Sequence, residues 1–189
     1  MARKSRATAA PGDTKPKRPP ASSKVLLKEL PSEEKMAQTV DALQKYGHQT
    51  TALMGAAYLE HALEFVLASK FRPLDKEEYA RMFDGAQGGI LGGFAAKIRI
   101  SYAANLLAPK PYHALLLIND IRNVFAHSLH RVSFNNKHVK RDCEKLASLS
   151  DPLAAAAGLH PIGIEPAIDI YAKMVKALYF SIRRIVAPM

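Results

Sequence analysis

Apolar side chains recur every three to four residues along most of the chain, the spacing that places them on one face of an α-helix. Clusters of proline and glycine interrupt this pattern and mark the connections. No stretch longer than residues 131–134 shows a strand pattern. The predicted helices cover residues 33–46, 49–71, a short stretch after Asp75, 94–107, 111–129, 138–149 and 166–186. The pattern therefore predicts an all-α helical bundle.

Capping signals support several of these helix ends. Ser32 can cap the first helix, whose first turn carries Glu33 and Glu34. Asp75 and Glu78 have the spacing of a capping box.

Two of the predicted helices have a clear apolar face that we expect to be buried. In the second helix this face contains Leu53, Ala56, Ala57, Leu63, Val66 and Leu67. In the last helix it contains Ile168, Tyr171, Met174, Val175, Leu178 and Ile182.

A glycine-rich segment separates the third and fourth predicted helices. Residues 84–93 hold five of the ten glycines, so we expect a loop that lets neighbouring helices pack closely. The alternative is an anion site at the start of the next helix, which carries Lys97 and Arg99. No Gly-Lys-Ser/Thr sequence follows, so the segment is not a P-loop.

Charge divides the chain in two. Residues 1–24 hold seven of the 27 Lys and Arg residues, one of the 17 acidic residues and four prolines. Such a segment cannot bury enough apolar surface to offset its ordering entropy, so we predict a disordered basic tail over residues 1–30 and a single helical domain over 31–189. The tail is either a solubilising arm or a loose nucleic-acid-binding segment using Arg3, Lys4, Arg6, Lys15, Lys17 and Arg18.

Composition excludes several classes of protein. The chain is 48% hydrophobic, enough for a core, yet no segment has the roughly 20 apolar residues of a membrane span. It shows no secretory signal, and its single cysteine, Cys143, suits a reducing compartment, so we expect a cytoplasmic protein. We expect no cofactor and no metal. The nearest candidate ligands match no closed zinc pattern: His127, His130, His138, Asp142 and Cys143.

The helix over residues 111–129 concentrates its polar side chains on one side. At about 100° per residue, Arg122, Asn123 and His127 fall within one arc. Asn119, Asp120 and Ala126 share that arc. The opposite arc, which we expect to face the core, holds Leu117, Ile118, Ile121, Val124, Phe125 and Leu129.

This arc has chemistry suited to phosphate. His127 can exchange a proton near neutral pH, and Arg122 can bind phosphoryl oxygens and stabilise a phosphorane-like transition state. Asn123 lies one turn before His127 and can orient it. Arg122 and His127 point about 140° apart on a straight helix, so one phosphate group can meet both only by one of three routes. The arginine curls across Ala126, the helix ends or distorts near His127, or the arcs of two subunits face each other in a two-fold dimer, which we favour. The alternative interpretation is a solvated polar face with no catalytic role.

Two carboxylates offer a supporting role. Glu60 and Glu64 lie one turn apart in an apolar helix and could hold Arg122 or His127 in place, with Glu60 as a candidate supporting residue. An exposed acidic stripe explains the same spacing.

Two resemblances follow from these residues. The sequence Arg122-Asn123-x-x-x-His127 at the end of an apolar helix resembles the signature of the HEPN superfamily of small, usually dimeric helical proteins, many of them metal-independent ribonucleases. Over about residues 35–150 the chain also resembles the mannitol operon repressor family. The matching segments are AAYLEHAL (56–63), MFDG (82–85), FAAKIRISYA (94–103), IRNVFAHS (121–128) and SF (133–134).

The resemblance implies a HEPN-like helical bundle and a homodimer that regulates gene expression through nucleic acid (RNA or DNA) or another regulatory protein. No helix-turn-helix is visible, and the glycine stretch 88–93 replaces the capping segment usual in the family. Two alternatives stay open. One is a metal-independent endoribonuclease in which Arg122, Asn123 and His127 are catalytic, and the other is a protein-interaction module without catalysis.

Overall fold

The computed structural model describes residues 30–150 and 165–186. Within these residues all regular structure is helical, which confirms the predicted all-α class. The helices are α2 (Glu33–Lys45), α3 (His48–Lys70), α4 (Lys76–Phe83), α5 (Phe94–Ala103), α6 (Pro109–His127), α7 (Lys137–Ser148) and α9 (Ala167–Arg184), with a 3₁₀ turn η1 (Gly85–Gln87). The predicted basic tail and most of the loop predicted over 150–163 lie outside the described residues.

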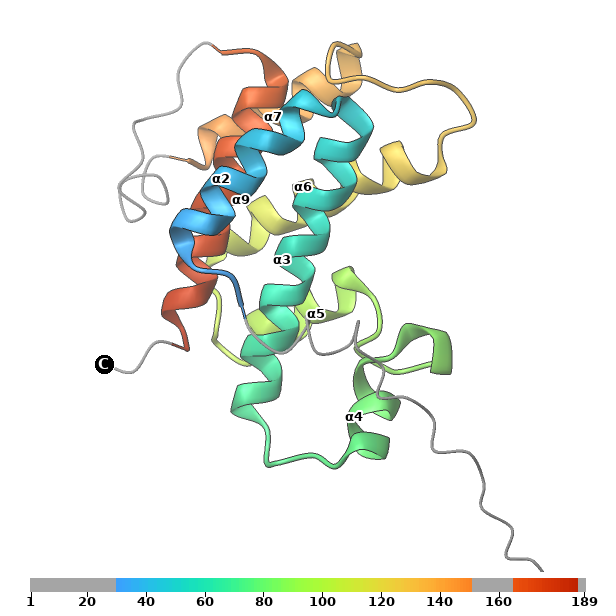
Figure 1. Ribbon diagram of the computed structural model, residues 1–189, viewed down its shortest axis with the longest axis vertical. Coiled ribbons are helices and arrows are strands. Elements are labelled where there is room, and N and C mark those ends of the chain that lie inside the picture. Colours follow the sequence, from blue (N-terminus) through green and yellow to red (C-terminus); the bar gives the residue numbers. More distant parts are fainter. Residues whose placement is uncertain (1–29, 151–164, 187–189) are drawn as a thin grey trace, which may run out of the picture.

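Helices α3 and α9 form the centre of the bundle (Figure 1). Helix α9 packs against α2, α3, α6 and α7, while α3 also packs against α2, α5 and α6. More than half of the residues of α9 are buried, and they join those of α3 and α6 in one core. Helix α4 lies at the lower end of the molecule, where Phe83 packs with Leu67 and Leu91 in a smaller cluster. No described helix is both long and apolar enough to cross a bilayer.

The predicted caps account for two of the helix starts. The Ser32 hydroxyl accepts a hydrogen bond from the Lys35 N–H at 3.2 Å. Asp75 and Glu78 form the predicted capping box at the start of α4. The chain before α2 is held by α9, because the Tyr179 hydroxyl donates to the Pro31 carbonyl at 2.8 Å. The bond between Tyr179 and Pro31 connects the two ends of the described chain.

Helix α5 ends earlier than the apolar pattern predicts. The prediction extended to residue 107, but the helix stops at Ala103. Asn105 adopts φ +55°, a left-handed conformation that asparagine tolerates and that ends the helix. Helix α6 then begins at Pro109, two residues before the predicted start, with this proline in the first turn.

The glycine-rich segment is packed backbone to backbone. A Cβ atom added to Gly92 would lie 2.4 Å from the Gly85 Cα atom, and one added to Gly89 would lie 2.8 Å from the Met82 carbonyl oxygen. No side chain fits at such distances. The structure thus gives a physical reason for glycine here and favours a close-packed connector.

The two faces predicted for α6 are only partly correct. Ile118, Ile121 and Phe125 are buried as predicted. The prediction is wrong for Val124 and Leu129, which are 46% and 98% exposed. Val124 lies at the edge of the apolar arc where no neighbouring helix covers it, and Leu129 lies beyond the end of the helix.

Two further positions depart from the predicted faces. Asn119, placed in the polar arc of α6, is only 8% exposed. Ala57, placed on the buried face of α3, is exposed. Helical periodicity thus located the core stripe but not its edges, because the edges depend on which helices lie alongside.

Candidate functional site

The predicted motif occupies the last two turns of α6. The helix is held by Ile118, Ile121 and Phe125 in the core and ends at His127, since Ser128 takes an extended conformation with ψ 131°. Arg122 and Asn123 are half-buried, whereas His127 is exposed at the helix end. The sequence therefore folds so that the motif runs from the bundle interior to the surface.

Arg122 makes its contacts inside the subunit. Its Nη1 atom donates a hydrogen bond to the Asn123 Oδ1 atom at 2.9 Å. Burial raises the pKa of the Tyr171 hydroxyl far above its usual range and Cys143 adds to this, while the positive charge of Arg122 acts in the opposite direction. The half-buried guanidinium is held on α6 by its hydrogen bond to Asn123.

The motif is not assembled within one subunit. In the part of the chain that the structure describes, no side-chain hydrogen bond joins His127 to Arg122 or to Asn123, whose Oδ1 atom accepts from Arg122. On a straight helix the two basic side chains point about 140° apart, and α6 ends at His127. A phosphate group held by both would need the arginine to curl across Ala126, a changed path at the end of the helix, or a second subunit.

The loop after the motif is fixed by contacts that the sequence did not reveal. The Phe134 N–H donates to the His48 Nδ1 atom at 2.9 Å, so this nitrogen carries no proton in the bonded state. The buried Phe134 ring lies against the rings of Phe125 and Tyr171, at centroid distances of 5.0 and 5.1 Å. The chain leaving His127 is therefore anchored to α3, α6 and α9. An isolated histidine at the start of α3 gave no signal of this role.

Glu60 and Glu64 do not reach the motif but hold a lysine of α5. The Lys97 Nζ atom lies 2.9 Å from Glu60 Oε1 and 3.0 Å from Glu64 Oε2, and its side chain is 3% exposed. The Tyr79 hydroxyl donates to Glu64 at 2.7 Å. Partial burial and this carboxylate raise the pKa of Tyr79 well above its usual range. These contacts tie α3, α4 and α5 together and leave Glu60 with a structural role.

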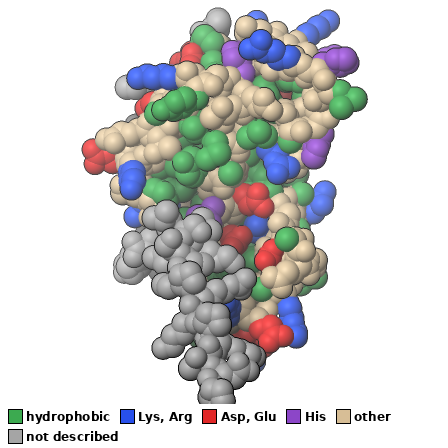
Figure 2. Space-filling model, turned by 45° about the vertical axis from the view of Figure 1, so that its right-hand side comes forward, with side chains coloured by type: hydrophobic (Ala, Val, Ile, Leu, Met, Phe, Trp, Pro, Cys, Tyr) green, Lys and Arg blue, Asp and Glu red, His purple; other side chains and the backbone are tan. Residues whose placement is uncertain are grey.

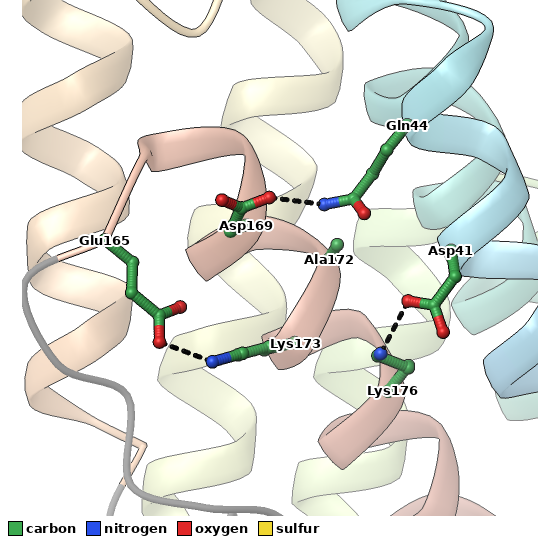
Figure 3. A pocket seen from close by; sticks show the side chains of 7 residues that line it. All are labelled: Asp41, Gln44, Glu165, Asp169, Ala172, Lys173 and Lys176. Carbon is green, nitrogen blue, oxygen red and sulfur yellow. Dashed lines mark hydrogen bonds and ion pairs between the residues drawn. The ribbon is translucent and has the colours of Figure 1, made fainter.

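A pocket of about 300 Å³ lies between α2 and the start of α9 (Figure 3). Its charged and polar side chains are paired with one another. Gln44 Nε2 donates to Asp169 Oδ1 at 2.7 Å, Lys176 Nζ lies 2.8 Å from Asp41 Oδ1, and Lys173 pairs with Glu165. None of the residues lining it belongs to α6. Because its charges are already paired, we assign the pocket no ligand.

The other candidate ligands are scattered. Cys143 is fully buried in the core, while His127, His130 and His138 are exposed. Among the described residues, no three His, Cys, Asp or Glu side chains are grouped as they would be around a metal ion. The tail residues predicted to bind nucleic acid lie outside the described residues.

Comparison with known proteins identifies the fold. No family model and no curated protein sequence matches the chain. The structure does match solved helical proteins. A possible transcriptional regulator, YggD from Shigella flexneri, matches with a TM-score of 0.58 and 15% sequence identity, over 84% of this chain and all of that chain.

A second match is the mannitol repressor MtlR from Escherichia coli, whose structure was solved as a complex with HPr. The TM-score is again 0.58, with 18% identity over 82% of this chain and 98% of that chain. The resemblance inferred from the sequence segments is thereby confirmed at the level of the fold.

Proposed function

We propose that this chain is a HEPN-like regulatory protein of the mannitol repressor type, which affects gene expression through contacts with protein or nucleic acid and catalyses no reaction. The observation that carries this proposal is the fold match, which spans more than four fifths of this chain and nearly all of both regulators. We further propose that residues 31–189 act as a single domain and that the protein is a homodimer.

The geometry of the motif supports a role without catalysis. Arg122 is half-buried and its guanidinium is bonded to Asn123, its neighbour on α6. His127 stands apart at the exposed end of α6. Catalysis of RNA cleavage would need both side chains on one phosphate group. The hydrogen bond from Arg122 to Asn123 supports a structural role for the motif in place of a catalytic one.

HPr is the first protein partner to test, because MtlR was solved in complex with HPr. The test is a calorimetric titration of this protein with the HPr of the same organism. We expect saturable binding. An absence of binding heat at concentrations up to about 100 µM, which corresponds to roughly −5.5 kcal/mol, would remove HPr as the partner.

A metal-independent endoribonuclease is the second candidate, and the exposure of His127 favours it. A two-fold dimer could place His127 of one subunit beside Arg122 of the other. The test incubates the protein with RNA in chelator, comparing the wild type with His127→Ala and with His113→Ala. His113 is a matched control, an exposed histidine in the first turns of the same helix.

We expect no cleavage above background in any of the three proteins. Chelator-resistant cleavage by the wild type and by His113→Ala, lost in His127→Ala, would overturn the non-catalytic proposal and establish the ribonuclease.

A further inference from the structure

The segment between the motif and the middle of α7 is strongly cationic. No acidic residue occurs between Asp120 and Asp142, while this interval holds five Lys and Arg residues and three of the seven histidines. We define the cationic loop as the connection after α6 together with the first turn and a half of α7. Its charged and titratable members are His130, Arg131, Lys137, His138, Lys140 and Arg141.

The fold presents these side chains to solvent. Phe134, which is 1% exposed, anchors the middle of the loop in the core, and Val139 anchors the start of α7. The six members of the cationic loop are all exposed. At the upper right of Figure 2, blue and purple side chains gather, and the red side chains in that view lie lower or to the left. The loop is therefore an ordered cationic surface of the folded part of the chain.

Internal ion pairs do not neutralise this charge. Further along α7, Lys145 pairs with Asp142 at 2.8 Å. By contrast, within residues 30–150 and 165–186, no salt bridge involves Arg131, Lys137, Lys140 or Arg141. Four like charges held on one short segment repel one another, and a polyanion relieves that repulsion.

We propose that the cationic loop binds a nucleic acid through its phosphate backbone. A protein interface of this kind would need an apolar centre, since protein interfaces are depleted of charge at their core. Within the cationic loop, Leu129 is the one strongly exposed large hydrophobic side chain, and a single such side chain does not form an apolar centre. Nucleic-acid interfaces are far more positively charged, and counterion release from phosphates supplies much of their affinity. Asn135 and Asn136, exposed beside Lys137, add amide groups that can donate to phosphate or sugar oxygens.

This inference rests on the proposed regulatory function and specifies the surface that its nucleic-acid contacts use. It concerns the folded part of the chain and is independent of the basic tail. It also places the bound strand next to His127, the last residue of α6. Binding there needs no cleavage, so the surface serves a regulator as well as an enzyme.

The test measures binding of a fluorescent 20-nucleotide polyuridylate RNA, and of polythymidylate DNA of the same length, to the full-length protein in chelator. The test variant carries Arg131→Gln, Lys137→Gln, Lys140→Gln and Arg141→Gln. The control variant removes four other exposed cations, with Lys70→Gln, Arg72→Gln, Lys76→Gln and Lys110→Gln, and so has the same net charge. Thermal unfolding followed by circular dichroism checks that both variants fold.

We expect the test variant to lose at least tenfold in affinity at 50 mM salt. The slope of log K against log salt concentration should fall by about 2–3, the value for four lost phosphate contacts to a single strand. The control variant should stay within about threefold of the wild type. Comparison of the two strands shows whether the surface prefers RNA or DNA. Cross-linking of 4-thiouridine RNA to peptides within residues 127–141 tests the same surface without any substitution.

Equal losses in the two variants would overturn the proposal, because the effect would then follow net charge. Loss of HPr binding with unchanged RNA binding would also overturn it and assign the surface to a protein partner. If RNA binding is absent while HPr binds, the cationic loop is refuted and the regulatory function stands. If neither binds, the proposed function fails as well.

Discussion

Lys97 is the charged residue that the described part of the fold buries most completely, and its energetics follow from its two partners. The side chain is 3% exposed, whereas Glu60 and Glu64 are 25% and 21% exposed. Removing the lysine leaves two carboxylates side by side in a partly buried site, which is more costly than losing a surface ion pair. Lys97 lies in a different helix from Glu60 and Glu64, so their pairing could not be predicted from the sequence.

Lys97→Ala should therefore lower the free energy of unfolding by about 2–4 kcal/mol. The control is Arg81→Ala, which removes an ion pair whose two side chains are 73% and 76% exposed and should cost less than about 1 kcal/mol. Urea unfolding followed by circular dichroism measures both. Equal effects of the two substitutions would show that the buried pairs contribute no more than a surface pair.

Cys143 makes the free energy of unfolding depend on pH in the alkaline range. Burial, aided by Asp142 and Glu144, raises the pKa of the thiol to about 12 in the folded state. The pKa of the Cys143 thiol is higher in the folded state than in the unfolded chain, where it is about 8.5. Below that pH the thiol is protonated in both states, and its contribution to the free energy of unfolding is fully present. The contribution is lost as the pH rises toward 12, at up to about 1.4 kcal/mol per pH unit.

We predict that the unfolding free energy of the wild type falls as the pH rises above about 9. Cys143→Ala should reduce that fall by about 1 kcal/mol between pH 9 and pH 10. The measurement is a series of urea unfolding curves from pH 7 to pH 10.5. Identical pH profiles for the two proteins would contradict the assigned role of the thiol.

At the level of elements, the sequence predicted best where local chemistry decides the structure. The helix starts at Glu33 and Lys76 are set by Ser32 and Asp75, whose caps are local in sequence. The end of α5 was missed because a single asparagine, Asn105, takes a left-handed conformation within a continuing apolar pattern. Helix caps can be identified from neighbouring residues in the sequence, whereas the left-handed conformation of a single asparagine cannot.

The candidate site shows the same limit. The motif residues Arg122 and His127 were found from their spacing, and His127 is exposed as a reactive group must be. The half-burial of Arg122 and the His48–Phe134 bond depend on α9 and α3, which are distant in sequence. Whether the motif residues come together depends on tertiary packing, which the helical periodicity of α6 does not predict.

Close packing of α3 against α9 depends on the absence of a side chain at Gly55. A Cβ atom there would lie 3.0 Å from the Tyr171 Cε1 atom and 3.2 Å from the Val175 Cγ2 atom. The Tyr171 ring cannot move away freely, because its hydroxyl donates to the Ala52 carbonyl at 2.7 Å. A methyl group at this position would overpack the interface between the two central helices.

Gly55→Ala should thus destabilise the fold by about 1–2 kcal/mol, although alanine favours a helix by about 1 kcal/mol over glycine. Ala57→Gly, at an exposed position of the same helix, serves as the control for the propensity contribution. Both are measured by urea unfolding. A Gly55→Ala protein more stable than the wild type would show that α3 and α9 can separate at little cost.

At the scale of the whole molecule, the proposed homodimer would bring two motifs together. Val124 and Leu129 are exposed hydrophobic side chains on either side of His127. A two-fold interface centred on the end of α6 would cover them and face each His127 toward the other subunit. Such an interface would account for the exposure of these two side chains in a single subunit.

Val124→Glu combined with Leu129→Glu should raise the dimer dissociation constant more than tenfold, since each places a charge in a desolvated interface. Ile90→Glu is the control, a 74% exposed hydrophobic residue in the glycine-rich segment. Sedimentation velocity over a range of concentrations measures the dissociation constants. Dissociation by the control alone would place the interface at the other end of the molecule, and a monomeric wild type would remove the dimer.

We propose that the protein regulates gene expression without catalysis by its Arg122–His127 motif. The most direct test of this proposal is RNA sequencing of three strains of the source organism, carrying the wild-type gene, a deletion or His127→Ala at the chromosomal locus. We expect the deletion to change the abundance of a defined set of transcripts and the His127→Ala strain to match the wild type. A His127→Ala strain that reproduces the transcript changes of the deletion, with protein levels unchanged, would contradict it.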